Sequence, residues 1–420
     1  MKRLLHIIEV IMITKTIIIL IVLLSTAYKI VLGLVQYRSA SNPTPANVSD
    51  VYDAETYARW QQYSKEKSRL RLIFTGIGAI ISLSLLATNA YAAFASLFPA
   101  DNWFLQPLAV IVLDIAVNLI PSIVRSYISN MIIEQKYGFN RTTLKTFIFD
   151  EIRSFLLELF LSVALVMLLL GVHTWLQDWL IVVFAATMFV FALFISFMYP
   201  IFSRIGNKFT PLEDGELKDR LMELLTKHGY KVKAIEVMDA SRRTTKLNAY
   251  FTGLGKMKTI VLYDNLVNAM TPDEICAVFA HEMGHGLHKD VMKSQIMNLG
   301  SFLLMGVLVW LAVREPILHT DFGFAEVNYG FAYLLVSAAL ELLQPLIALL
   351  TNAHSRRAEY RADQQAVTEG YGEAMITALK KLARENFAHL APAKLDILLD
   401  YSHPPLSERI AAVQKQLDDK

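Results

Sequence analysis

The sequence predicts a mainly α-helical protein that crosses a membrane several times and carries a small α+β domain. Hydrophobic residues make up 54% of the 420 residues, more than is usual in soluble proteins. Seven apolar segments are long enough to span a bilayer. After the fifth, the pattern changes to that of a soluble domain. We therefore expect an N-terminal membrane domain with five spans (1–204) and a second domain with two more (205–420).

The expected spans are apolar runs with few charges. The first resembles a signal peptide, but it continues beyond the weak cleavage-like sequence Ser25-Thr-Ala27, which favours a retained helix. A basic amphipathic stretch at 57–71 is suited to lie along the membrane surface. The seven spans are expected at about residues 7–35, 72–98, 104–124, 154–172, 179–202, 295–313 and 327–350.

Lys and Arg residues gather in alternate loops: between spans one and two, between three and four, and after spans five and seven. The positive-inside rule then places the soluble part of the second domain and the C-terminus in the cytoplasm. The net charge is only +2, and no basic patch is interleaved with aromatic residues, so nucleic acid is not expected as a partner. The single cysteine, Cys276, excludes disulfides within the chain.

One helix carries the pattern that indicates chemistry. Thr271 can cap it, Pro272 suits its first position, and the sequence then reaches His281-Glu282-Met-Gly-His285. The two histidines are one turn apart on the same face, so both imidazoles can bind one tetrahedral zinc ion, with Glu282 beside them. This HExxH arrangement is typical of zinc peptidases, although it also occurs by chance in unrelated helices.

A second helical segment offers the missing ligand. Glu359 and Asp363 share a face in the sequence Ser355-Arg-Arg-Ala-Glu359-Tyr-Arg-Ala-Asp363. Glu359 can be the third zinc ligand, which leaves the fourth position for water, and Asp363 can accept the distal N–H of a ligating histidine. The competing interpretation is a solvated charged face that pairs with Arg356 and Arg357.

The soluble segment between the fifth span and the HExxH helix predicts a helix at 213–229, a strand at 231–238 and a hairpin formed by 247–251 and 259–263. An extended peptide can add to the open edge of such a hairpin, although a purely structural hairpin is an equal alternative. Near the C-terminus, His403 precedes two prolines, which hold it in an extended or turn conformation suited to projecting a donor.

Three carboxylates, Asp114, Glu158 and Glu341, lie within expected spans, where contact with lipid is costly. They indicate a transport pathway, a hydrated reaction chamber or polar pairing between helices.

Several motifs together resemble the CAAX prenyl protease 1 family of integral-membrane zinc peptidases. They are the HExxH at His281, the Glu359 helix, Asn248-Ala-Tyr-Phe-Thr-Gly253 with Ile260-Val-Leu-Tyr-Asp264, and Ser402-His-Pro-Pro. In the N-terminal half, Glu134-Gln-Lys-Tyr-Gly-Phe-Asn140-Arg-Thr-Thr and Gln61-Gln-Tyr-Ser-Lys-Glu-Lys are also similar to loops of that family.

The resemblance implies seven helices around a large hydrated chamber, one zinc ion per chain, and cleavage of C-terminal tripeptides from isoprenylated CaaX proteins. Its motif positions make His281, His285 and Glu359 the ligands and Glu282 the base. They also assign Asn248 and Ala249 to the strand that holds the substrate. His403, or as a second choice Arg409, would contact the substrate or the oxyanion.

The expected activity is that of a zinc endopeptidase cutting near the C-termini of isoprenylated or other membrane-associated proteins. Its partners are then a peptide or protein substrate and the lipid bilayer. One alternative is an HtpX-like protease that degrades damaged membrane proteins. Another is a non-catalytic transporter or scaffold, which the intact Glu282 disfavours. The short loop between spans six and seven and the absence of an endoplasmic-reticulum signal at Lys420 favour a prokaryotic cell membrane, with the endoplasmic reticulum as the site if the source is eukaryotic.

Overall fold

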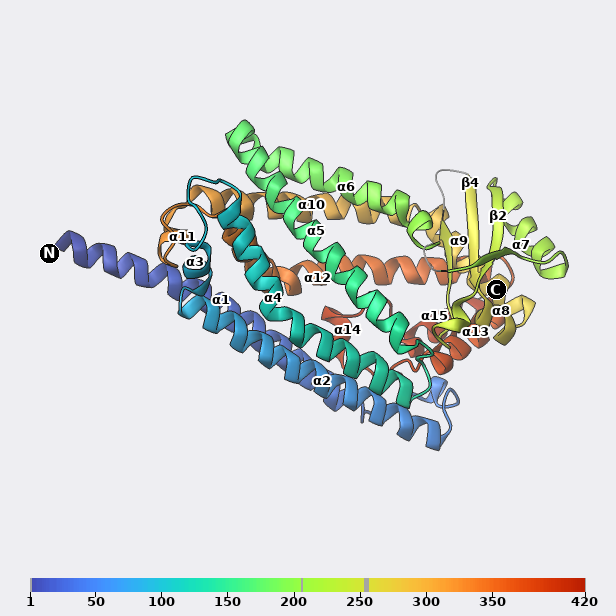
Figure 1. Cartoon of the computed structure of the whole chain (residues 1–420). Coiled ribbons are helices and arrows are strands. Elements are labelled where there is room, and N and C mark those ends of the chain that lie inside the picture. The colour runs from blue at the N-terminus through green and yellow to red at the C-terminus, as the bar shows by residue number, and fades with distance from the viewer. Residues whose placement is uncertain (1, 205–206, 253–256, 420) are drawn as a thin grey trace.

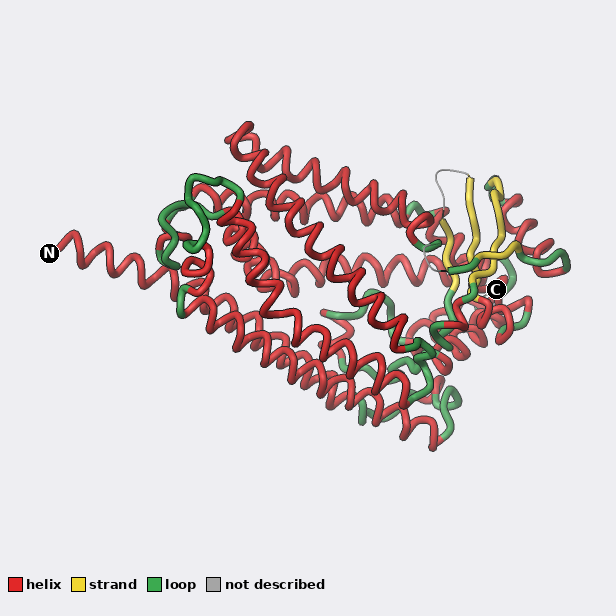
Figure 2. The backbone as a smooth tube through the Cα atoms, viewed as in Figure 1, coloured by secondary structure: helices red, strands yellow, loops and turns green. Residues whose placement is uncertain are grey.

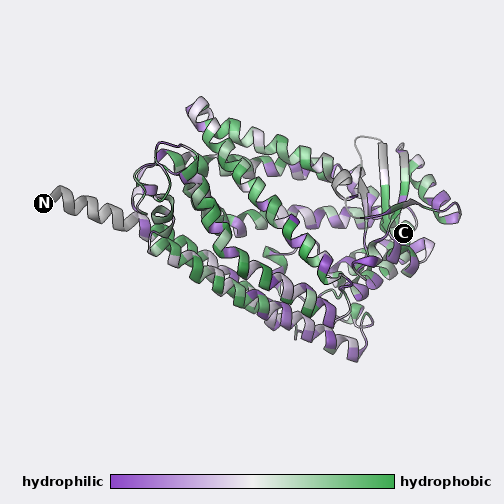
Figure 3. Cartoon of the chain, in the orientation of Figure 1, coloured by the Kyte–Doolittle hydropathy of each residue, from purple (hydrophilic) through white to green (hydrophobic). Residues whose placement is uncertain are grey.

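A computed structural model describes residues 2–204, 207–252 and 257–419. Long helices fill most of the molecule, and one small sheet lies at the end opposite the N-terminus (Figure 1). All of the strands gather at that end (Figure 2). Hydrophobic residues dominate the long helices, whereas hydrophilic residues concentrate around the sheet (Figure 3). The mainly helical fold with a small α+β part is therefore confirmed.

Six of the described helices are long and apolar enough to cross a membrane. They are α1 (Lys2–Ser39), α2 (Ala54–Ala87), α4 (Leu105–Tyr127), α5 (Leu144–Leu176), α10 (Asp290–Arg314) and α12 (Tyr329–Thr368). The expected span at 179–202 corresponds to α6 (Leu180–Phe202), within which the apolar segment Leu180–Ser196 is shorter than these six. Seven spans remain an expectation.

The second span differs from its prediction at both ends. Asp53 caps α2 by accepting a hydrogen bond from the Thr56 amide, and the helix then runs without a break to Ala87. The basic stretch at 57–71 is thus part of the same helix and not a separate surface helix. The helix stops because Asn89 adopts a left-handed conformation with φ of 56°, after which α3 (Ala90–Ala95) begins.

The last span and the Glu359 segment form one helix. α12 continues for 40 residues through Pro345, so Glu359 and Asp363 lie on the extension of a membrane helix. It ends at Thr368, where Gly370 adopts a φ of +90°. The other helices that follow α10 in the chain are α11 (Ile317–Thr320), α13 (Gly372–Glu385), α14 (Lys394–Leu399) and α15 (Leu406–Asp418).

The sheet has the order β1-β2-β4-β3. β2 (Lys231–Met238) and β4 (Met257–Tyr263) are parallel, whereas β1 (Phe209–Pro211) and β3 (Ala249–Thr252) pair antiparallel with them. β1 was not predicted, because three residues give no periodicity. The predicted hairpin turn at 253–256 lies outside the described residues. Since β3 pairs only with β4 in the described sheet, it is an edge strand.

The HExxH helix, α9 (Pro272–Leu287), is the centre of this end of the molecule. Thr271 and Glu274 form the predicted capping box, with Pro272 at the first position. One side of α9 packs into a core with α13 and α15, and the other packs against the sheet, α7 (Glu216–Lys227) and α8 (Asp264–Ala269). Two cores therefore hold the helix that carries His281 and His285.

Candidate metal centre

The structure brings His281, His285 and Glu359 together from two helices. One ligand atom from each residue lies within 4.8 Å of the others. The Nε2 atom of His281 is 3.5 Å from one Glu359 carboxylate oxygen, and the Nε2 atom of His285 is 3.4 Å from the other. Both imidazoles therefore direct the same ring nitrogen towards one carboxylate.

Behind His281 lies an ion pair. The Nδ1 atom of His281 is 2.9 Å from Asp363, whose ionised carboxylate can only accept a hydrogen bond. The Arg409 guanidinium donates to both oxygens of the same carboxylate, at 2.9 and 2.6 Å. In a neutral imidazole, this contact places the single N–H on Nδ1, so that the Nε2 lone pair can bind a metal ion.

Behind His285 lies a second carboxylate, which sequence reasoning missed. The Nδ1 atom of His285 is 3.2 Å from Asp290, and Asp290 also accepts a hydrogen bond of 2.8 Å from Arg361. The feature of the sequence that could have indicated this contact is an acidic residue five positions after the second histidine. Periodicity could not indicate the contact, because α9 ends and α10 begins between the two residues.

These residues fit a metal cation. The Glu359 Oε2 atom is buried and has no hydrogen-bond partner within the described part of the chain, although Nε2 of His281 and a guanidinium nitrogen of Arg409 lie 3.5 and 3.4 Å away. Burial disfavours the His285 imidazolium, but Glu359, Asp290 and Glu282 outweigh it and raise the pKa of His285 to about 9. The same negative potential favours a bound cation, and two imidazoles with one carboxylate suit zinc.

The other predicted site residues surround this centre. Glu282 is half-buried on α9 next to His281. Nε2 of His403 lies 3.3 Å from Glu359, and the His403 side chain is 62% exposed, so it lies on the accessible side of the cluster. Arg409 is only 12% exposed and is held by Asp363. Ala249 is the first residue of β3, which contacts α9, and Asn248 directly precedes this strand.

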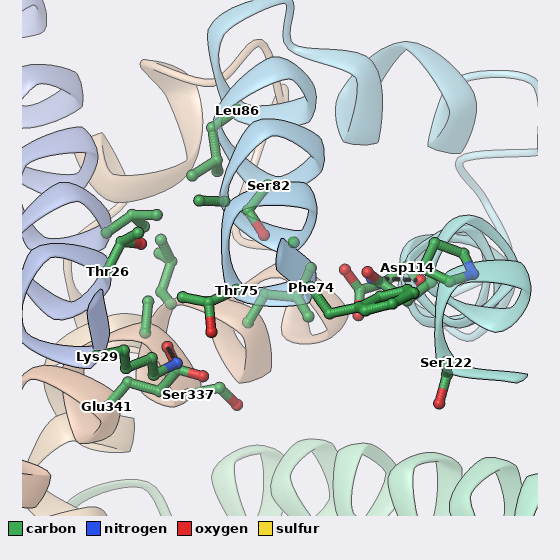
Figure 4. Close-up of a pocket in the computed structure, with 18 of the residues that line it drawn as sticks. Thr26, Lys29, Phe74, Thr75, Ser82, Leu86, Asp114, Ser122, Ser337 and Glu341 are labelled. Carbon is green, nitrogen blue, oxygen red and sulfur yellow. Dashed lines mark hydrogen bonds and ion pairs between the residues drawn. The ribbon is translucent and has the colours of Figure 1, made fainter. Parts of the chain in front are cut away.

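A separate cavity of about 460 Å³ lies between α1, α2, α4 and α12. At one side of it, Lys29 and Glu341 point towards each other and form an ion pair of 2.7 Å (Figure 4). Asp114 also lines it and accepts a hydrogen bond from Tyr91. Two of the three intramembrane carboxylates thus face one cavity, whereas Glu158 on α5 is exposed and lies outside its lining.

Both halves of the chain match known protein families. Residues 211–417 match Peptidase family M48, and residues 34–204 match the CAAX prenyl protease N-terminal family of five membrane helices. The CAAX prenyl protease 1 homolog of Oryza sativa subsp. japonica is 30% identical over 91% of this chain and 93% of that protein. This chain belongs to the CAAX prenyl protease 1 family. The family predicted from the sequence motifs is thereby confirmed.

Two further comparisons support this assignment to the CAAX prenyl protease 1 family. CAAX prenyl protease 1 of Saccharomyces cerevisiae is 30% identical over 90% of each chain. The crystal structure of S. mikatae Ste24p superposes with a TM-score of 0.87, at 28% identity over 95% of this chain and 99% of that one. The protein is therefore an integral multi-pass membrane metallopeptidase with a Ste24p-like fold.

Proposed function

We propose that this protein is a zinc endopeptidase that cuts isoprenylated CaaX-type or other membrane-associated proteins near their C-termini. The observation that carries the proposal is the approach of His281, His285 and Glu359 within 4.8 Å, beside Glu282. The names of the relatives supply the substrate class. Their match over nine-tenths of this chain supports extending that class to it.

The zinc ligands in this proposal are Nε2 of His281, Nε2 of His285 and the Glu359 carboxylate. When bound, zinc supplies Lewis acidity that polarises a carbonyl and lowers the pKa of water. Glu282 accepts a proton from the attacking water and later delivers it to the departing amine. Because Glu282 is half-buried and makes no hydrogen bond within the described part of the chain, its carboxylate is available for this transfer.

His403 is assigned to the oxyanion of the tetrahedral transition state. It is exposed and lies 3.3 Å from Glu359, so it can donate to an oxygen near the ligand cluster. Arg409, the second choice from the sequence, has two of its nitrogens engaged by Asp363. We therefore assign Arg409 to holding Asp363, which in turn holds His281.

Asn248 and Ala249 are assigned to substrate binding. The described sheet leaves the outer edge of β3 open, and β3 contacts α9. An extended peptide that pairs with this edge would be held by main-chain hydrogen bonds next to the histidines. The carbonyl of Asn248 accepts from the Tyr263 amide, so β4 already occupies one edge of this segment.

A hydrated chamber inside the membrane domain is also part of the proposal. Its support is the cavity between α1, α2, α4 and α12, which is lined by Lys29, Glu341 and Asp114 (Figure 4). Water in the cavity would solvate these groups and reduce the cost of placing them within the membrane. The positive-inside pattern supports a metal centre on the cytoplasmic side, in a prokaryotic cell membrane or in the endoplasmic reticulum.

The test uses purified, zinc-loaded protein and one CaaX peptide in prenylated and unprenylated forms, with mass spectrometry to locate the cut. We expect cleavage of the prenylated peptide at the CaaX junction. Glu282→Gln should lower the rate by about 10²- to 10⁴-fold, because it removes the general base while keeping the side-chain volume. The variant should still bind zinc, since Glu282 is not a ligand.

Three results would contradict parts of this proposal. Equal cutting of both peptides, or cutting at internal sites, would replace the CaaX assignment by general membrane proteolysis of the HtpX type. Cleavage that persists in Glu282→Gln would remove Glu282 from the mechanism. If neither peptide gave a Glu282-dependent product, the prenyl-peptide activity would be rejected.

A further inference from the structure

Asp290 lies at the junction between the HExxH helix and a membrane helix. α9 ends at Leu287, and Lys289 adopts a left-handed conformation with φ of 54°, so the chain turns before α10 begins at Asp290. The turn directs the first side chain of α10 back to His285, where Oδ2 is 3.2 Å from Nδ1. Asp290 is 6% exposed, so its carboxylate is buried beside the ligand cluster.

Arg361 holds the other oxygen of this carboxylate. Its guanidinium donates to Asp290 Oδ1 at 2.8 Å from α12, two residues after Glu359. Lys293 also faces Oδ1, but at 3.7 Å and with a side chain that is 47% exposed. Among the described lysine and arginine residues, the buried carboxylate therefore pairs directly with Arg361, whereas Lys293 lies farther away on the surface.

The arrangement repeats the one behind His281. There, Asp363 contacts Nδ1 and is held by Arg409. Here, Asp290 contacts Nδ1 of His285 and is held by Arg361. In both cases the opposite ring nitrogen faces Glu359. Each histidine thus has its own carboxylate, and each carboxylate has its own arginine.

We propose that Asp290, held by Arg361, is a positioning residue for His285. Asp290 accepts the Nδ1–H of His285 and so fixes the tautomer and ring orientation that present Nε2 to the metal ion. The inference rests on the proposed metal site. It adds that the start of membrane helix α10 and the ligand helix α12 together set the geometry of one ligand.

The experiment measures zinc affinity of the full-length protein by competition with a chromophoric chelator, without any substrate. Asp290→Ala should lower the affinity by about 10- to 100-fold, which is the usual effect of removing a carboxylate that orients a ligating histidine. Asp290→Asn keeps the shape but offers both a donor and an acceptor, so it should give a smaller loss. Arg361→Gln should also lower the affinity, because Asp290 loses its direct partner.

Lys293→Ala is the matched control, because it removes a charge facing the same carboxylate without touching Arg361. Its zinc affinity should equal that of the wild type. The absorption spectrum of the cobalt-substituted protein provides a second measurement, since it reports the ligand geometry. We expect a changed spectrum in Asp290→Asn and an unchanged one in Lys293→Ala.

Thermal unfolding of the metal-free variants separates folding from metal binding. If Asp290→Ala fails to fold, the nearly isosteric Asp290→Asn decides the question. Wild-type affinity and an unchanged cobalt spectrum in Asp290→Asn would overturn the inference while leaving the metal site intact. An equal loss in Lys293→Ala would also overturn it. Failure of the wild-type protein to bind zinc or cobalt would reject both this inference and the zinc mechanism.

Discussion

Gly284 of α9 lies against Ala362 of α12, so that a Cβ atom at Gly284 would be 2.9 Å from the Ala362 Cα atom. The same Cβ would be 3.1 Å from the Cβ of Gln365. Gly284 stands just before His285, and Ala362 just before Asp363. The absence of a side chain at Gly284 therefore lets α9 and α12 approach closely enough for both histidines to lie beside Glu359.

Gly284→Ala should weaken both folding and metal binding. The added methyl group meets backbone rather than a flexible side chain, so α9 and α12 must separate. We expect a loss of stability of about 1–3 kcal/mol, as is usual for overpacking, together with reduced zinc affinity. Chemical unfolding and chelator competition measure the two effects. Gly300→Ala on α10 is the control, because a Cβ there meets nothing within 4 Å. Equal behaviour of the two variants would contradict the packing argument.

Arg409→Met should destabilise the protein strongly. The Asp363 side chain is 1% exposed, so removal of the guanidinium leaves an unpaired charge in the interior. Breaking such a buried pair costs about 3–5 kcal/mol. Arg242 pairs with Asp239, but the Arg242 side chain is 67% exposed. Arg242→Ala should therefore lower the stability by less than about 1 kcal/mol. Urea unfolding of both variants measures the two losses of stability. Similar losses would show that the buried Arg409–Asp363 pair stabilises the protein no more than an exposed pair does.

Removal of the metal ion should lower the unfolding temperature and abolish peptidase activity. A ligand that binds only the folded state stabilises it by about 2.7 kcal/mol at 100 times its dissociation constant. Adding zinc back after chelation should restore both properties. Glu359→Gln should weaken or remove the thermal response to zinc, because it replaces the charged ligand by an amide. A wild-type thermal shift in that variant would exclude Glu359 as a ligand.

Mild acidification should lower the free energy of unfolding because His389 is buried in its neutral form. Its ring lies 4.7 Å from the Trp60 ring, and its Nδ1 atom accepts a hydrogen bond from the Ala391 amide. Burial lowers the pKa of His389 from 6.5 to about 4. Between these values the unfolded chain binds a proton that the folded protein does not, so this contribution to stability falls as the pH drops from 6.5 towards 4.

The check is to measure the unfolding free energy of the wild type and His389→Gln across that range. The variant should show a shallower decline, because its side chain does not titrate. The other acidic and histidine residues titrate in both proteins, so the difference between the two curves isolates His389. Parallel curves would mean that His389 does not change its pKa on folding.

Local patterns predicted much of this protein. The boundaries of β2 and the capping box of α9 followed from propensity and from residues adjacent in sequence. His281 and His285 share a face because helical geometry alone fixes a separation of four residues. Four of the first five expected spans (7–35, 104–124, 154–172 and 179–202) coincide, to within one residue, with parts of α1, α4, α5 and α6, whereas the expected 72–98 extends past the end of α2 at Ala87.

Contacts between distant segments could not be predicted in the same way. The turn at Lys289 brings Asp290 to His285, and the union of the last span with the Glu359 segment makes one helix of 40 residues. The contact of Gly284 with Ala362 likewise depends on how two helices pack.

The sequence by itself determined which residues could bind a metal ion, because spacing along a helix is a local property. Only the tertiary structure decided which carboxylate and which arginine stand behind each histidine. Those choices depend on helix ends and interhelical packing, whose free energies come from contacts between residues far apart in the chain.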